Sequence, residues 1–101
     1  MEKGGCVYIL SNKNRTVFYT GVTSDIRHRI YQHRYENGSK FTTKYNVKNL
    51  LYFQSYPSIE EAIHNEKLLK KWNRNWKLEL IQKNNPEFID LAIDWFDENY
   101  D

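Results

Sequence analysis

Residues 6–21 read CVYILSNKNRTVFYTG, and this stretch indicates the kind of fold. Residues 6–11 and 16–21 are rich in Val, Ile, Tyr, Phe and Thr, the residue types that favour β-strands. The polar residues 12–15 between them are typical of a turn. The stretch therefore predicts a β-hairpin.

Each predicted strand of this hairpin carries a tyrosine. If the turn is centred on Lys13 and Asn14, Tyr8 lies directly opposite Tyr19. Opposite residues share one face of a sheet, with Cβ atoms ~4.5–5.5 Å apart. Taken alone, the pair is explained by ordinary cross-strand aromatic packing.

Outward from the hairpin, the sequence predicts a third strand and several helices. Thr23 or Ser24 offers a helix N-cap, and Ser58 with Glu61 forms a capping box. The predicted elements are a helix ending near Glu36, a strand at 47–56, helices at 58–72 and 74–83, and a helical tail at 87–99. The fold class is α/β (α+β), with a small, mostly antiparallel three-stranded sheet in the order β-β-α-β-α-α plus a C-terminal helix.

Length and composition limit the number of domains and the cellular compartment that the sequence predicts. The 101 residues fit one domain, and the single Cys6 excludes an intrachain disulfide and a cysteine zinc cage. The longest apolar run, residues 6–10, is too short for a signal peptide or a membrane span. We therefore expect a cytoplasmic protein with no membrane partner, as a monomer or weak dimer.

The charge is unevenly distributed. Residues 1–85 carry 15 Lys and Arg against seven acids, a net charge of +8, whereas residues 86–101 carry six acids and no base. A basic body suits a polyanion such as nucleic acid, although a solvated surface of mixed charge is an equal reading. We predict a domain at 1–85 with an acidic helical tail, 86–101, docked on it.

Two charged positions lie on or beside apolar helix faces. On the first helix, Arg29 and His33 flank the stripe of Ile26 and Ile30, where a snorkelling arginine and a satisfied histidine are the ordinary explanation. On the next helix, Glu66 lies in the middle of the apolar face. A buried carboxylate needs a partner, which leaves open an ion pair with an arginine or Lys70, or a functional site.

Several kinds of site are absent from the sequence. It has no P-loop, no GxGxxG pattern and no nucleophile–histidine–acid arrangement, and His28, His33 and His64 lack zinc-ligand spacing. One carboxylate with a hard divalent ion and an arginine is instead a site suited to phosphodiester cleavage.

At this point the sequence resembles the GIY-YIG nuclease superfamily over about residues 5–85. The residues that carry the resemblance are Cys6-Val7-Tyr8, Tyr19-Thr20-Gly21, Arg29, His33 and Glu66. The chain is similar to small stand-alone members related to the N-terminal nuclease domain of excinuclease C. It departs from the motif at Cys6, in place of glycine, and at Val7 and Thr20, in place of isoleucine.

The resemblance implies an endonuclease that hydrolyses DNA with one Mg²⁺ or Mn²⁺ ion. Structure-selective cleavage and a link to DNA repair or processing fit the same resemblance, and RNA is left open as substrate. The resemblance also implies metal binding by Glu66, a phosphate clamp at Arg29, and water activation by Tyr19 with Tyr8 positioning the water. We expect His33 to share the base role, which at its ordinary pKa places a rate inflection between pH 5.5 and 8.

Four further residues are candidates for substrate binding. They are Gly21, whose backbone a ligand can approach closely, together with Thr23, Lys40 and Lys44. The alternative to an enzyme is a non-catalytic nucleic-acid binding module that keeps the fold. A third reading is a protein–protein adaptor that uses the acidic tail.

Overall fold

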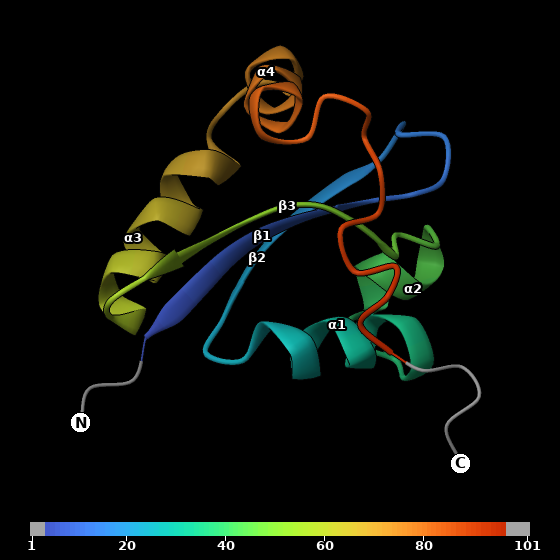
Figure 1. The fold of residues 1–101 in the computed structure, drawn as a ribbon, viewed down its shortest axis with the longest axis horizontal. Helices are drawn as coiled ribbons and strands as arrows, with labels where there is room; N and C mark the ends of the chain where they lie inside the picture. The colour runs from blue at the N-terminus through green and yellow to red at the C-terminus, as the bar shows by residue number, and fades with distance from the viewer. Residues whose placement is uncertain (1–3, 97–101) are drawn as a thin grey trace.

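The computed structural model describes residues 4–96 as a three-stranded antiparallel sheet flanked by helices, which confirms the predicted α+β class (Figure 1). Figure 1 shows α1 and α2 on one side of the sheet and α3 and α4 on the other. The elements are β1 (Gly5–Ser11), β2 (Phe18–Thr23), α1 (Ile26–Tyr35), α2 (Lys40–Lys44), β3 (Asn49–Tyr56), α3 (Ile59–Lys70) and α4 (Arg74–Asn84).

The central strand β1 organises both halves of the core. The sheet order is β2-β1-β3, and every residue of β1 is buried. Because side chains alternate along a strand, Val7 and Ile9 join the cluster on the α3 and α4 side, whereas Tyr8 and Leu10 join the cluster that contains Ile30 of α1.

The predicted hairpin is present, but the strand register predicted for it was wrong by two residues. Tyr8 pairs with Gly21, and Tyr19 pairs with Leu10. The connection is longer than a tight turn because the Asn12 side-chain oxygen accepts hydrogen bonds from the backbone of Thr16 and Val17, at 2.8 and 3.0 Å. A shift of two preserves the side-chain period, so the two tyrosines still share a face.

The helix starts partly follow the prediction. Ser58 caps α3, accepting a hydrogen bond from the Glu61 backbone at 3.2 Å. The cap of α1 is Asp25, not Thr23 or Ser24, since its carboxylate accepts from the His28 backbone. The short helix α2, capped by Ser39, was not predicted.

The C-terminal segment, residues 86–96, is not the helix that the periodicity predicted. Phe88 has a positive φ of 53°, and the segment forms turns. The predicted tail beyond residue 96 lies outside the described residues. The apolar positions are nevertheless used: Leu91, Ala92 and Trp95 pack against the cluster on the α1 side.

Asp90 holds this segment across the free edge of β3. Its carboxylate accepts hydrogen bonds from the backbone N–H groups of Leu50 and Ala92, each at 3.1 Å, and is ion-paired with Arg34 of α1. The Leu91 N–H donates to the Leu50 carbonyl at 2.8 Å. Figure 1 shows the segment running from α4 past β3 to α1.

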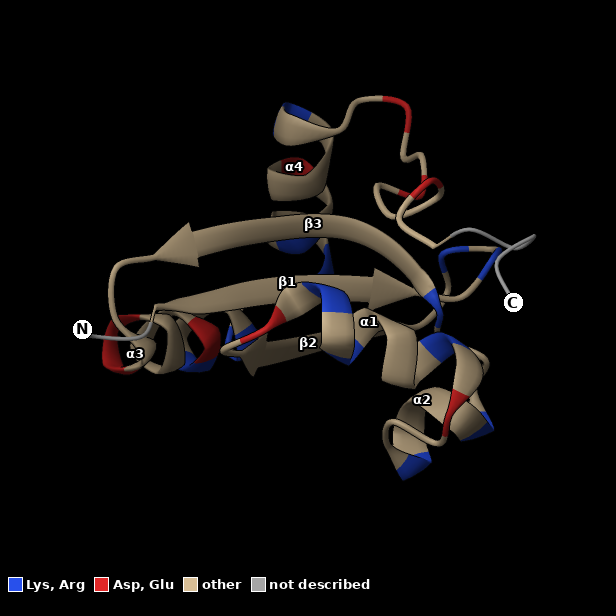
Figure 2. Ribbon diagram, turned by 60° about the horizontal axis from the view of Figure 1, so that its bottom comes forward, with Lys and Arg blue, Asp and Glu red and all other residues tan. Residues whose placement is uncertain are grey.

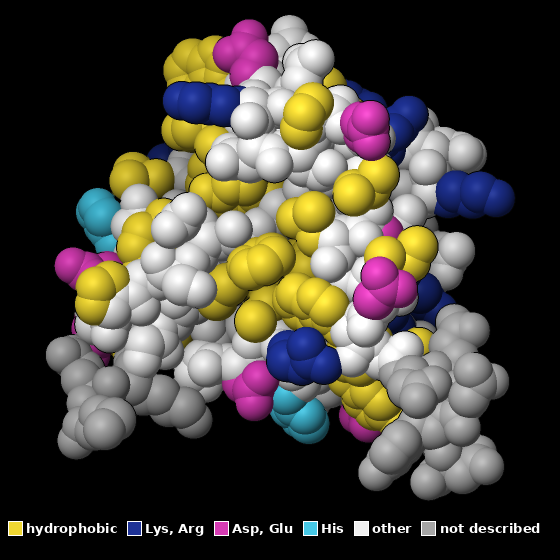
Figure 3. Space-filling model, in the orientation of Figure 1, with side chains coloured by type: hydrophobic (Ala, Val, Ile, Leu, Met, Phe, Trp, Pro, Cys, Tyr) yellow, Lys and Arg dark blue, Asp and Glu magenta, His cyan; other side chains and the backbone are white. Residues whose placement is uncertain are grey.

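The surface reflects the uneven charge of the sequence. Figure 2 shows basic positions along α1 and α2, and acidic positions in the first turn of α3 and in the C-terminal segment. Hydrophobic side chains gather in the middle of the face seen in Figure 3. Within residues 4–96, no helix has the length and apolarity needed to cross a membrane.

We predict that Asp90→Ala lowers the free energy of unfolding by about 2–4 kcal/mol, because it strips partners from a partly buried arginine and two backbone N–H groups. Urea denaturation measures the change. Asp94→Ala is the matched control, since Asp94 is exposed. Equal effects of the two substitutions would contradict this role for Asp90.

Candidate active site

The site is built around Tyr8, whose ring lies over Gly21 of the neighbouring strand. A Cβ atom at residue 21 would stand 2.4 Å from the Tyr8 hydroxyl and ring, a distance that side chains do not tolerate. The Tyr8 ring thus occupies the space that a side chain at residue 21 would fill, so this position requires glycine.

His33 connects this tyrosine to two helices. Its Nε2 lies 3.0 Å from the Tyr8 hydroxyl, and its Nδ1 lies 3.0 Å from the Thr42 hydroxyl of α2. A neutral imidazole has one N–H donor and one acceptor nitrogen, so it can satisfy both hydroxyl groups at once. Only 2% of His33 is exposed, so the imidazole is locked by both contacts.

Tyr19 completes an aromatic group on the same face. Its ring centroid lies 6.3 Å from that of Tyr8, 5.6 Å from that of His33 and 5.9 Å from that of Phe41. The structure therefore brings the two predicted tyrosines and the predicted histidine together, even though the two tyrosines are not directly opposite.

Arg29 is held beside this group by a loop that the sequence indicated only as a helix stop. Its guanidinium donates to the Gln32 side chain and to the Gly38 carbonyl, both at 2.9 Å. A Cβ at residue 38 would meet His33 Nδ1 at 2.7 Å. The glycine after α1 was thus a signal, missed at the level of sequence, that this loop returns against its own helix.

Glu66 is buried, as its place on the apolar face predicted, with 8% of the residue exposed. Lys70 lies one turn later, and its Nζ is 2.7 Å from Glu66 Oε2. This ion pair is one of the alternatives left open by the sequence. The carboxylate also lies near enough to Tyr8 for its charge to raise the pKa of the phenol.

Burial shifts the two hydrogen-bonded partners in opposite directions. It raises the pKa of Tyr8 to about 12, against the lowering effect of the Arg29 guanidinium. It lowers the pKa of His33 to about 4, and the charge of Arg29 adds to that shift. Tyr8 is thus a protonated phenol and His33 a neutral imidazole at neutral pH. The rate inflection predicted for a shared base role of His33 is accordingly expected near pH 4 and not between pH 5.5 and 8.

The four residues predicted to bind substrate lie in different surroundings. Gly21 lies beneath the Tyr8 ring, and Thr23 exchanges hydrogen bonds with the Asp25 backbone at 3.1 and 3.2 Å. Lys40 and Lys44 are exposed on α2 and line a depression of about 580 Å³. Their part in binding stays a prediction.

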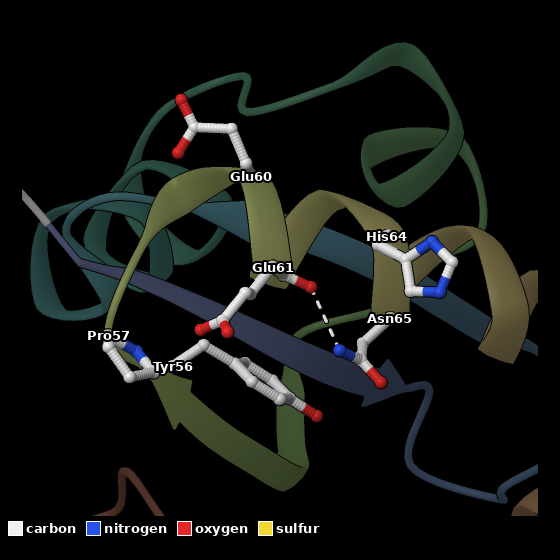
Figure 4. Close-up of a pocket in the computed structure, with 6 residues that line it drawn as sticks. All are labelled: Tyr56, Pro57, Glu60, Glu61, His64 and Asn65. Atoms are coloured by element: carbon white, nitrogen blue, oxygen red, sulfur yellow. Dashed lines mark hydrogen bonds between the residues drawn. The ribbon is translucent and has the colours of Figure 1, made fainter.

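A second depression lies at the start of α3, with a volume of about 590 Å³, and carries Glu60, Glu61 and His64. Figure 4 shows these three side chains pointing in different directions, with Glu61 beside Tyr56. Among the described residues, no group of three or more His, Cys, Asp or Glu side chains is placed to hold a metal ion.

Glu66 by itself fits the ion that the resemblance implies. A carboxylate is the oxygen ligand that Mg²⁺ prefers, and Mg²⁺ commonly takes only one or two protein carboxylates while keeping several waters. Lys70 already shows that a cation is held at this carboxylate. Any metal ion there has to compete with that ammonium group.

The family model of the GIY-YIG catalytic domain matches residues 4–79, and the chain belongs to this family. The match spans β1 to the first half of α4, and therefore includes the two tyrosines, Arg29, His33 and Glu66. Membership places the protein in a nuclease family whose substrates are nucleic acids.

The relatives are small proteins named UPF0213. One from Streptococcus pneumoniae is 30% identical over 100 residues, covering 99% of this chain and 97% of the relative. One from Clostridium perfringens is 39% identical over 75 residues, covering 74% and 80%. The solution NMR structure of the UPF0213 protein from Bacillus halodurans has a TM-score of 0.55 and 29% identity, covering 90% of this chain and 97% of that one.

We predict that His33 makes folding stability depend on pH. The pKa of His33 is about 4 in the folded protein, against 6.5 for an unperturbed histidine, so the unfolded chain binds the extra proton first. Its contribution, about 3 kcal/mol, is present above pH 6.5 and is lost as the pH falls towards 4.

Urea denaturation from pH 7 to 4.5 tests this. We expect His33→Gln to flatten the pH dependence of unfolding, while His28→Gln, an exposed histidine on the same helix, leaves it unchanged. An unaltered slope in His33→Gln would show that His33 is not held neutral.

Proposed function

We propose that the protein is a metal-dependent endonuclease that hydrolyses phosphodiester bonds in DNA, in a process such as DNA repair. The observation that carries this is the meeting of two phenols, a neutral imidazole and a guanidinium on one sheet face, with a buried carboxylate nearby. Family membership supports the same class of chemistry.

Arg29 is the group proposed to hold the scissile phosphate. Its guanidinium always carries a charge, and two of its N–H groups are anchored to Gln32 and Gly38. A planar fork fixed in this way presents its remaining donors to phosphate oxygens without further ordering. It can also stabilise the negative charge that grows as the phosphate is attacked.

Tyr8 and Tyr19 are proposed to handle the attacking water. The Tyr8 hydroxyl lies 3.0 Å from His33 Nε2, which fixes its position, and its oxygen is proposed to hold and orient a water molecule. Because burial raises the pKa of Tyr8 to about 12, it positions water rather than ionising. Tyr19 is the proposed proton acceptor, and His33 supports it by fixing the Tyr8 hydroxyl.

Glu66 is the residue proposed to hold one Mg²⁺ or Mn²⁺ ion. Such an ion, when bound, stabilises negative charge on the phosphate and leaving oxygens. Lys70, whose side chain is 54% exposed, can leave the carboxylate at little cost. The ion pair then keeps the carboxylate compensated whenever no metal is present.

The test is a cleavage panel of branched and linear DNA with Mg²⁺ or Mn²⁺. We expect Glu66→Gln and Arg29→Ala to reduce the cleavage rate about 100-fold or more, because each removes charge stabilisation from the transition state. Glu60→Gln is the matched control, an exposed glutamate on the same helix.

Circular dichroism and urea denaturation confirm that the variants fold. DNA binding without hydrolysis by the wild type, on every substrate and with either ion, would favour the non-catalytic binding module. Equal rates for Glu66→Gln and Glu60→Gln would remove Glu66 from the reaction.

A further inference from the structure

A cation-lined pocket opens at the outer edge of β2, beside the candidate active site. Its volume is about 310 Å³, and its lining residues are Phe18, Tyr19, Thr20, Phe41, Lys70 and Lys77. β2 is an edge strand, so no further strand of the described sheet covers this side. The pocket shares Tyr19 with the aromatic group around His33 and Lys70 with the Glu66 ion pair.

The cations around this edge are not all compensated. Arg74 donates to the carbonyls of Arg15 and Thr16, at 2.6 and 3.0 Å, and Lys70 is paired with Glu66. Within residues 4–96, no carboxylate is ion-paired with Lys77. Burial, and after it the neighbouring Lys70 charge, lower the pKa of Lys77.

The wall of the pocket also contains an unsatisfied polar group. Thr20 is 4% exposed, and its hydroxyl oxygen has no hydrogen-bond partner among the described residues. Buried hydroxyl groups are normally hydrogen-bonded. The donor that an anion in the pocket would meet is the Lys77 ammonium, with the unpartnered Thr20 hydroxyl buried behind the lining.

We propose that this pocket binds the phosphate group of the nucleotide next to the scissile phosphate, with Lys77 as the binding residue and Lys70 as the second cation at its rim. This rests on the proposed function, because a polynucleotide held at Arg29 brings a neighbouring phosphate to an adjoining site. The aromatic walls of Phe18, Tyr19 and Phe41 suit the sugar and base of that nucleotide.

The first test measures binding of a labelled single-stranded oligodeoxynucleotide in EDTA, over a range of salt concentrations. We expect Lys77→Met to reduce the slope of log K against log salt by about 0.7, the value for one phosphate contact on a single strand. Lys83→Met, an exposed lysine on the same helix, should leave the slope unchanged. Identical slopes for the two variants would overturn the pocket.

The second test replaces single DNA linkages on either side of the scissile one by uncharged methylphosphonates. At one linkage, the replacement should weaken wild-type binding about tenfold, as the loss of a charge-assisted hydrogen bond does, but leave the binding of Lys77→Met unchanged. An equal loss in both proteins at every linkage would refute the assignment of Lys77.

The two proposals fail in distinguishable ways. A slope difference specific to Lys77, in a protein that does not hydrolyse any DNA of the panel, supports the pocket and refutes the endonuclease. Hydrolysis that depends on Glu66, with no slope difference at Lys77, refutes the pocket and leaves the endonuclease standing.

Discussion

The Tyr8 side chain couples the sheet to both helices of the candidate site. Its ring fills the space above Gly21, and its hydroxyl reaches His33 Nε2 at 3.0 Å. His33 in turn reaches Thr42 of α2. One buried side chain thereby sets the distance between the hairpin and α1, and the placement of Arg29 on that helix depends on it.

Burial gives the same group its electrostatic character. An exposed histidine would titrate near neutral pH, but here the cost of burying a charge, with the nearby guanidinium, keeps His33 neutral. Burial also makes the phenol that faces it keep its proton, against the lowering effect of the guanidinium on the phenol pKa. The site therefore holds the permanently charged Arg29 guanidinium beside a protonated phenol and a neutral imidazole.

Two ion pairs link the site and its helix α1 to neighbouring parts of the fold. Glu66 is matched by Lys70, and Arg34 of α1 is matched by Asp90 of the C-terminal segment. The Asp90 pair covers the edge of β3, where exposed N–H and C=O groups would otherwise remain unpaired. The opposite edge, at β2, carries the pocket with Lys77. The two edges of the sheet thus have different partners, one covered by the chain itself and one open beside the site.

The sequence by itself determined the strands, three of the four helices, and the buried or flanking positions of Arg29, His33 and Glu66. These follow from local periods of 2 and 3.6 residues and from caps such as Ser58, which depend only on neighbours in the chain. Only the tertiary structure decided the hairpin register, the path of residues 86–96 and the partners of each polar group. Those depend on contacts between residues far apart in sequence, such as Asp90 with Leu50, and a helical period in the tail could not reveal that its backbone is bound to a strand edge.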